Sequence, residues 1–511
     1  MKMMTKIKYL MVAVAMMFAT TSCLDKLPGS AIPTDEAMQS YEDAEQTLTG
    51  IYAMMKSSAL WSGYLTLLPD IQTDLVYAVD GYSNTYGQHW MWDIRSTNSE
   101  IEAVYASLYG IISNCNFFLE KIDNIVAKQT DDNRITILEQ YTGEVYTIRA
   151  LCYSELLKLY CKAYNPTTAD TDLGVVLRKH YSTPERSVRA SMKESYEFVL
   201  SDLEKAENIL DPDYDAYSSY YMTNAVAHAL HARVALYMQD WESAIEHSSE
   251  VIGRDTHYIL DPANIEWSNG MTYFDRMWCY DTSYETLWQV GFTTTSMGGA
   301  LGQVFLSFNN DYTYYYPDYV PAEWVLNLYT SGDMRYNSYF ATLTTGYDHG
   351  LTWPLLIKYY GNQNFIGYYI YHVVMPKPFR LAEQYLIRAE AYCRQENPNF
   401  SLASRDLTTL RENRFTSGGG GISLSKDNFI EEIANERVRE LYMEGHRLQD
   451  IKRWGDLYRN GEGFTRKQQN NTLKAGSSLS KKANDPLFVW PIPQHELEAP
   501  GSEVEPNESN N

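Results

Sequence analysis

Apolar residues recur at helical spacing through most of the chain. In residues 35–56 they fall three and four positions apart, which is the pattern of a helix with one face on a core. The same spacing predicts further helices at 100–125, 134–164, 191–210, 223–239, 241–252, 380–395 and 401–413. The sequence therefore predicts a mainly α-helical fold.

Two pairs of these helices have the form of a tetratricopeptide repeat. In residues 225–252 and 381–414, alanines such as Ala235 and Ala244 stand where the two helices of a pair would approach each other closely. Repeats of this kind stack into a superhelical scaffold, and their concave surface usually binds protein partners. We expect such a scaffold to form one part of this protein.

Residues 253–378 interrupt the helical pattern. Helical spacing survives there only at 322–329, whereas apolar and polar residues alternate at 284–292, as in a strand. The segment is rich in Tyr, Trp, Asn, Gly and Thr. We expect an irregular half of loops and short strands, inserted between the helical pairs.

Aromatic residues gather in this insertion and in residues 60–92, where turn-forming residues surround them. The face of an aromatic ring can stack on the apolar face of a sugar, while Asn and Asp side chains bind the sugar hydroxyls. The alternative is that each ring packs beneath its own loop. The candidates for ligand contacts are Trp61, Tyr64, Tyr77, Tyr82, Tyr86, Trp267, Trp278, Tyr312, Tyr314, Tyr315 and Trp353.

Residues 428–455 have the pattern of one amphipathic helix with charges on its apolar face. Arg437 and Glu444 fall inside the apolar stripe, where a charge is tolerated only when it is paired. We expect these two residues to form a structural ion network with Glu440 and Arg447. A solvated helix with surface ion pairs is the alternative, and the nearby arginines argue against catalytic carboxylates.

Overall charge and tyrosine content narrow the possible functions. The net charge of −23 repels phosphates, which disfavours a nucleic-acid ligand. The chain has 43 tyrosines, and tyrosine combines an apolar face with a polar tip. Most of these rings are expected in the core, but enough remain for a binding surface that contacts hydroxyl groups.

The N-terminus has the features of an export signal. Residues 1–22 combine early lysines with an apolar run at 9–19, which is too short to span a membrane. Cys23 follows small residues and is the expected site of lipidation, and residues 23–34 would then be a tether to the membrane. Plain secretion is the alternative. At the other end, the acidic residues 501–511 are expected to be disordered.

Three histidines could in principle contribute to a metal site. His228 and His231 lie within one helical turn, and His247 follows in the next predicted helix. No carboxylate or thiol completes a set of ligands on the same helix face. We therefore expect no metal site and no cofactor.

Four stretches of the chain resemble motifs of the SusD/RagB family of surface glycan-binding lipoproteins. The longest, ANERVRELYMEGHRLQDIKRWG, is similar to the C-terminal signature of that family. It matches through Glu436, Arg437, Arg439, Glu440, Leu441, Glu444, Gly445, Arg447, Asp450, Arg453, Trp454 and Gly455. The other three stretches are residues 143–160, which depart from the family pattern at Val145, residues 380–391, and the closing WPIPQHEL at 490–497.

This resemblance implies a single SusD-like domain at 35–500, with an N-terminal part at about 35–250, the insertion at 253–378 and a C-terminal part at about 379–500. It implies an α/α superhelix of tetratricopeptide type beside an irregular ligand-binding half. It also implies a non-enzymatic lipoprotein on the outer surface of a Gram-negative bacterium. Such a protein would capture a glycan and deliver it to a SusC-like TonB-dependent transporter. Within 60–92, the resemblance favours Tyr77, Tyr82 and Tyr86 as glycan contacts.

Two other functions remain possible on the sequence alone. A helical-repeat adaptor that binds only a protein would leave the aromatic clusters unexplained. A glycoside hydrolase would need two carboxylates beside a sugar cleft, and Asp70, Asp74, Asp80 and Asp93 lie near the first aromatic cluster.

Overall fold

The computed structural model describes residues 37–181, 186–309, 311, 313–346, 353–416, 418–469 and 478–510. The predicted signal at 1–22, the tether at 23–34, the lipidation site Cys23 and the candidate Tyr312 lie outside these residues. Within them, no helix is both long enough and apolar enough to cross a membrane.

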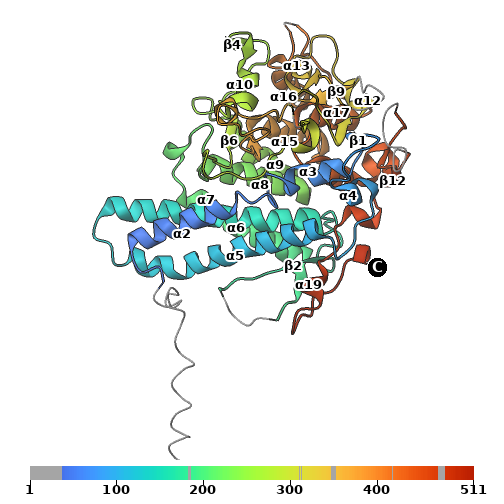
Figure 1. The fold of residues 1–511 in the computed structure, drawn as a ribbon. Coiled ribbons are helices and arrows are strands. Elements are labelled where there is room, and N and C mark those ends of the chain that lie inside the picture. Colours follow the sequence, from blue (N-terminus) through green and yellow to red (C-terminus); the bar gives the residue numbers. More distant parts are fainter. Residues whose placement is uncertain are drawn as a thin grey trace, which may run out of the picture.

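Long helices form one half of the molecule, as the periodicity predicts. Figure 1 shows α2, α5, α6 and α7 side by side, and α6 packs against both α5 and α7. The chain continues through α8 and α9, and α9 packs against α15, which in turn packs against α16. The bounds of these helices are Tyr41–Met54 (α2), Ser99–Val126 (α5), Asp132–Tyr160 (α6), Met192–Ile209 (α7), Asn224–Met238 (α8), Trp241–Ile252 (α9), Leu381–Arg394 (α15) and Phe400–Glu412 (α16).

Polar caps set where several of these helices begin. Ser40 accepts a hydrogen bond from the backbone of Asp43 and thereby starts α2, six residues after the predicted start. Ser191 and Glu194 form the same reciprocal box at the start of α7. The side chain of Asp240 caps α9, whose bounds equal the predicted range.

The helical-repeat prediction is confirmed by the packing of α8, α9, α15 and α16. Ala235, Ala244, Ala389 and Ala391 are almost completely buried, with at most 1% of each residue exposed. Because α9 packs against α15, the two repeats stack although more than 120 residues separate them in the sequence. The mainly α-helical fold class is therefore confirmed.

The insertion is irregular, as predicted, but it contains more helical turns than the sequence indicates. Its short helices are Tyr273–Tyr280 (α10), Gln303–Leu306 (α11), Glu323–Leu326 (α12), Arg335–Tyr339 (α13) and Gln363–Ile366 (α14). Its strands are Glu266–Ser268 (β4), Met271–Thr272 (β5), Thr286–Trp288 (β6), Tyr319–Pro321 (β7), Phe340–Thr342 (β8) and Pro354–Leu356 (β9).

The strands in the described ranges pair two by two, and all pairs are antiparallel. Two pairs join the insertion to other parts of the chain: β7 to β1 (Val76–Ala78) and β6 to β10 (Phe379–Arg380). The pairs β4–β5 and β8–β9 lie within the insertion. The remaining pairs are Leu173–Val176 (β2) with Arg189–Ser191 (β3) and Phe464–Thr465 (β11) with Ser480–Lys481 (β12).

The predicted aromatic loop at 60–92 is largely ordered secondary structure. It contains α3 (Tyr64–Ile71), β1 and α4 (Gly87–Met91). Every residue of α3 after Tyr64 is buried, because its leucines and Ile71 pack into the interior. The prediction of a displayed loop is therefore wrong for most of this segment, and only residues 80–86 remain loop-like and partly exposed.

The predicted helix at 428–455 is two helices, α17 (Phe429–Glu440) and α18 (Arg447–Trp454). The chain turns between them, with Met443 at φ +60° and Gly445 at φ +83°. A Cβ atom on Gly445 would lie 2.4 Å from the carbonyl oxygen of Leu65. The break lets residues 441–446 cross closely over α3, a tertiary contact that helical spacing does not reveal.

The C-terminal residues 501–510 are not disordered, contrary to the prediction. The Asn507 amide donates hydrogen bonds to the carbonyl oxygens of Tyr160 (2.8 Å) and Trp490 (2.9 Å). Asn510 bonds to both backbone groups of Ile492. The asparagine side chains of the tail thus pair with backbone carbonyls at the end of α6 and in the WPIP segment. These contacts order the tail, although its composition predicts disorder.

Candidate functional site

Glu440 is the centre of a buried ion network beneath the insertion. Its carboxylate accepts from Arg380 (2.8 Å), Arg335 (2.9 Å) and Arg414 (3.0 Å), and all four side chains are 1% exposed or less. Burial would raise the pKa of Glu440, but the three guanidinium groups outweigh it and hold that pKa well below its usual range. Glu440 is therefore an ionised structural group.

The neighbouring glutamates extend the same network. Glu436 accepts from Arg335 (2.7 Å) and Arg439 (2.6 Å). Burial opposes its ionisation, yet Arg439, Arg335 and Arg411 lower the pKa of Glu436 to about 2. Glu444 accepts from Lys358 (2.6 Å) and Arg380 (2.7 Å).

The two arginines named from the sequence pair outside their own helix. Arg437 donates to Asp450 in α18 at 2.6 Å, and Arg447 donates to Asp74 at 3.1 and 3.2 Å. All four residues of the expected network thus take part in buried ion pairs. Their main partners, Arg335, Arg380, Arg414 and Asp74, come from distant segments, which spacing within one helix could not identify.

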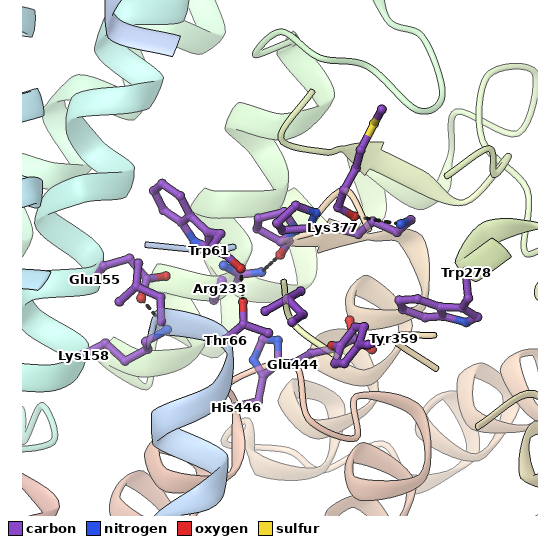
Figure 2. A pocket seen from close by; sticks show the side chains of 15 residues that line it. Trp61, Thr66, Glu155, Lys158, Arg233, Trp278, Tyr359, Lys377, Glu444 and His446 are labelled. Atoms are coloured by element: carbon purple, nitrogen blue, oxygen red, sulfur yellow. Dashed lines mark hydrogen bonds and ion pairs between the residues drawn. The ribbon is translucent and has the colours of Figure 1, made fainter. Parts of the chain in front are cut away.

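A small polar cavity lies between the helical half and the insertion (Figure 2). Trp61 and Trp278 line it from opposite sides, together with charged groups such as Lys158, Arg233 and Glu444. Its volume of about 30 Å³ has room for a water molecule but not for a sugar ring. This cavity is therefore a buried polar junction and not a ligand site.

Three aromatic candidates are buried and cannot present a ring to a ligand. Trp61 packs edge-on against Trp288, with 5.7 Å between ring centroids. Trp278 is covered on one face by the Lys358 ammonium group, 4.2 Å from the ring. Tyr77 lies within β1 and is 2% exposed. The structure thus corrects the expectation for Trp61, Tyr77 and Trp278, which are core residues.

Tyrosines with exposed or half-buried rings occur instead on three segments, at residues 80–86, 307–318 and 360–372, and the second segment contacts both of the others. We call these five residues the tyrosine surface: Tyr82, Tyr314, Tyr316, Tyr368 and Tyr369. Tyr368 and Tyr369 are 70% and 84% exposed, and Tyr314 and Tyr316 are 45% and 37% exposed. Exposure of this extent leaves ring surface of Tyr314, Tyr368 and Tyr369 accessible to a ligand.

Phe308 joins the second and third loops beneath this surface. Its ring lies 4.9 Å from that of Tyr315, 5.5 Å from that of Tyr371 and 4.8 Å from that of His372. The hydroxyl groups of Tyr315 and Tyr360 are 3.1 Å apart. Tyr315 therefore lies in the support of the surface, half-buried, and the exposed rings project from the loops beside it.

Asp318 holds the first loop against the second. Its carboxylate accepts from the backbone N–H of Ser83 at 2.8 Å and from the Ser83 hydroxyl at 2.9 Å. The Tyr319 hydroxyl donates to the carbonyl oxygen of Thr85 at 2.6 Å. Tyr82 packs edge-on against Tyr319, 6.0 Å away. These contacts fix Tyr82 beside the loop that carries Tyr314 and Tyr316.

The same loops also present hydrogen-bonding groups. The Tyr82 hydroxyl donates to the Asn84 side chain at 2.7 Å, and burial raises the pKa of Tyr82, so the phenol stays protonated. Gln363 and Asn364 are exposed at the start of the third loop. Aromatic rings can stack on the apolar face of a ligand, and the neighbouring amide groups can hydrogen-bond to its hydroxyl groups.

The other aromatic candidates do not join this surface. Tyr64 and Tyr86 are half-buried and pack edge-on against each other at 5.8 Å. Trp353 donates its indole N–H to the Pro321 carbonyl at 2.8 Å and packs on the core beside β9. Trp267 is 38% exposed, but it belongs to a separate group on β4 with Tyr280 and Arg276.

Sequence reasoning missed Tyr316, Tyr368 and Tyr369. For Tyr368 and Tyr369 the signal was present as the tyrosine-rich run at 368–371, which follows Gly367 and has neither helical nor strand periodicity. Tyr369 adopts a left-handed backbone conformation at φ +63°, which turns the chain at the point of highest exposure. That conformation follows from the closure of the loop and is not encoded in the tyrosine run itself.

Two family models match successive parts of the chain. One, described as "SusD family", matches residues 282–505, and the other, described as "Starch-binding associating with outer membrane", matches residues 23–236. A relative from Formosa agariphila, SusD-like protein P25, is 23% identical over 500 residues, which cover 88% of this chain and 90% of the relative.

Solved structures share the fold over nearly the whole chain. A SusD superfamily protein from Bacteroides thetaiotaomicron has a TM-score of 0.74 and 22% identity, covering 92% of this chain and 99% of that protein. A putative sugar binding protein from Bacteroides vulgatus has a TM-score of 0.73 and 21% identity, covering 93% and 100%. Surface glycan-binding protein A from Bacteroides fluxus has a TM-score of 0.68 and 18% identity, covering 91% and 99%. The solved structures show that the fold is shared, and the two family models, which together match residues 23–236 and 282–505, place the chain in the SusD family.

Proposed function

We propose that this protein captures an oligosaccharide or polysaccharide at the tyrosine surface without cleaving it. The observation that carries this proposal is the exposure of Tyr314, Tyr316, Tyr368 and Tyr369 on loops that meet around Phe308. Covering an exposed aromatic ring with a ligand removes apolar surface from water, which is favourable. A sugar can cover the ring because it has an apolar face as well as hydroxyl groups. Relatives described as sugar binding and as glycan binding support the same ligand class.

Three of the four carboxylates named near the first aromatic segment have partners that favour binding over hydrolysis. Asp70 accepts from the backbone N–H groups of Gly445 and Arg447, each at 2.9 Å, and Asp74 is paired with Arg447. Asp93 is exposed and pairs with Arg95 at 3.3 Å. A glycosidase needs two carboxylates facing a sugar about 5 to 9.5 Å apart. Carboxylates already committed to the backbone and to arginines are poorly suited to that role.

We further propose that the protein acts at the outer membrane. Lipid on Cys23 would hold it there, and the family model that covers residues 23–236 is described as associating with the outer membrane. The ligand would pass to a SusC-like TonB-dependent transporter, and the helical-repeat half offers a surface suited to a protein partner. A protein-binding adaptor without a glycan ligand is the alternative to this assignment.

The test is calorimetric titration of the purified protein against a panel of plant and host polysaccharides, with reducing ends measured after incubation. Saturable binding of one glycan class without new reducing ends is the expected result. The double variant Y368A/Y369A should lose that binding. The matched control is Tyr214→Ala, which removes a ring that is 56% exposed in a different part of the chain.

Three outcomes would contradict the proposal. Release of reducing ends would indicate a glycosidase. Recovery of a transporter with the protein, combined with no glycan binding by either the protein or the complex, would indicate an adaptor. Equal loss of binding in the control variant and the double variant would place the ligand elsewhere.

A further inference from the structure

A second polar cluster lies far from the tyrosine surface in the sequence, where α7, α8 and α9 pack together. It contains Glu207 from α7, His228 and His231 from α8, and His247 from α9. His228 and His231 are three residues apart and therefore face the same side of α8. The cluster plays no part in the glycan site proposed above.

The four side chains bring their potential metal-binding atoms close together. The Oε1 atom of Glu207 lies 2.8 Å from Nδ1 of His231, 3.4 Å from Nδ1 of His247 and 3.6 Å from Nδ1 of His228. The Nδ1 atoms of His228 and His247 are 2.9 Å apart. Glu207, His231 and His247 offer ligand atoms that all lie within 4.8 Å of one another.

These separations are those of a tetrahedral zinc site. With Zn–N and Zn–O bonds of about 2.0 to 2.1 Å, two ligand atoms of a tetrahedron lie about 3.3 Å apart. The imidazole rings of His231 and His247 are stacked, with 3.5 Å between centroids and 18° between planes. A rotation of one ring about its side-chain torsions would direct both lone pairs at a shared ion.

Two short contacts connect the side chains of the cluster, one between Glu207 and His231 and one between His228 and His247. A neutral imidazole has one ring nitrogen that carries a lone pair and no proton. Glu207, His231 and His247 bring ligand atoms within 4.8 Å of one another, so one cation could bind all three side chains at once.

The surrounding charges permit a dication. Arg254 is a cation that acts on His228, but its guanidinium forms an ion pair with Asp215 and donates to Asn224 at 2.6 Å. Glu207 supplies a negative charge, and Asp240 adds another nearby. The four side chains are between 9% and 15% exposed, which leaves a path for an ion from solvent.

We propose that Glu207, His231 and His247, with His228 beside them, bind one divalent transition-metal ion, with Zn²⁺ as the preferred ion. Imidazole ligands favour Zn²⁺, Cu²⁺ and Ni²⁺ over Ca²⁺ and Mg²⁺, which prefer oxygen. The bound ion would link three successive helices of the repeat scaffold. The sequence pointed away from this site because the carboxylate comes from α7 rather than from the helix that carries two of the histidines.

The test is calorimetric titration of Zn²⁺ into protein that carries no histidine tag and has been stripped of metal with a chelator. We expect one equivalent of Zn²⁺ to bind and the midpoint of thermal unfolding to rise. The variants Glu207→Gln and His247→Ala should each weaken binding by roughly 100-fold or more. Titration with Co²⁺ should give the visible absorption of a tetrahedral site.

A matched control distinguishes this cluster from an ordinary histidine–carboxylate pair. His180→Ala removes an exposed imidazole whose Nδ1 atom lies 3.3 Å from Glu120 and which, among the described residues, forms no hydrogen bond with another histidine. This variant should bind Zn²⁺ as the unmodified protein does. Circular dichroism in the presence of chelator checks that each variant is folded. If His247→Ala does not fold, Glu207→Gln still tests the proposal, because glutamine has nearly the same size as glutamate. Absence of saturable binding, or binding that Glu207→Gln leaves unchanged, would overturn the proposal.

Discussion

Arg380 and Glu440 lie 60 residues apart in the sequence and form a buried ion pair with 2.8 Å between Nη1 and Oε1. The same guanidinium also donates to Glu285 at 2.7 Å and to Glu444 at 2.7 Å. Arg380 ends β10 and directly precedes α15, whereas Glu440 ends α17. One arginine thus ties the insertion to the repeat scaffold and to the family signature.

Glu440→Gln should lower the free energy of unfolding by about 3 to 5 kcal/mol, the usual cost of leaving buried charges unpaired. Glutamine has nearly the same shape, but its amide cannot balance the charges of Arg335, Arg380 and Arg414. Urea unfolding followed by circular dichroism measures the change.

A surface ion pair provides the comparison for that variant. Glu42 pairs with Arg134 at 3.2 Å, and the two side chains are 58% and 45% exposed. Glu42→Gln should change the free energy of unfolding by less than about 1 kcal/mol. If the two variants lost similar amounts of unfolding free energy, burial of the Glu440 network would not increase its contribution to stability.

The helices of the scaffold could be predicted because their signals are local. Residues 241–252 form α9 over the predicted range, since Asp240 caps the helix and its buried face repeats every turn. The break after Glu440 could not be predicted in this way. It depends on how closely Gly445 approaches the carbonyl of Leu65, a residue 380 positions earlier in the chain.

The candidate site was less predictable than the fold. The sequence shows that Trp61 and Trp278 are aromatic, but only the packing shows that both are buried beside a small cavity (Figure 2). Tyr369 carries the same chemistry and is 84% exposed. Likewise, Glu207 meets His231 only because α7 packs against α8. Exposure and convergence of side chains are tertiary properties, which a single sequence does not display.

Gly445→Ala should destabilise the protein by a few kcal/mol, on the order of the cost of a strained backbone combined with a steric clash. The residue has φ +83°, and a Cβ atom would lie 2.4 Å from the Leu65 carbonyl oxygen. Gly50→Ala is the matched control, because Gly50 lies in α2 and a Cβ atom there would meet nothing within 4 Å. That control should be neutral or stabilising by up to about 1 kcal/mol. Thermal and urea unfolding of both variants measure the difference, and equal effects would contradict the argument.

Tyr369→Phe should keep most of the affinity for the glycan, whereas Tyr369→Ala should weaken it by roughly 10-fold. The reason is that the exposed ring is proposed to act through its face, and phenylalanine retains that face without the hydroxyl. Calorimetric titration of both variants with the glycan identified in the polysaccharide panel makes the comparison. If the phenylalanine variant loses as much affinity as the alanine variant, the hydroxyl rather than the ring face carries the contact.

Glu144→Gln should remove a pH dependence of stability between about pH 4.5 and pH 8. Glu144 is 4% exposed, and its carboxyl group accepts a hydrogen bond of 2.6 Å from the Tyr52 hydroxyl. Burial raises the pKa of Glu144 to about 8, and the Tyr52 hydrogen bond only partly offsets this. In that window the folded protein therefore keeps a proton that the unfolded chain has released.

The sign of the effect follows from this difference in bound protons. The contribution of Glu144 to stability is fully present below the unfolded pKa and is lost as the pH rises through the folded pKa. Relative to the unmodified protein, Glu144→Gln should thus gain roughly 2 to 4 kcal/mol between pH 5 and pH 8. Urea unfolding at several pH values measures this gain, with Glu139→Gln, an exposed position on the same helix, as the control. If the stability of Glu144→Gln and of the unmodified protein changed in parallel with pH, Glu144 would be ionised when folded, and the Tyr52 hydrogen bond would be strong enough to compensate for burial.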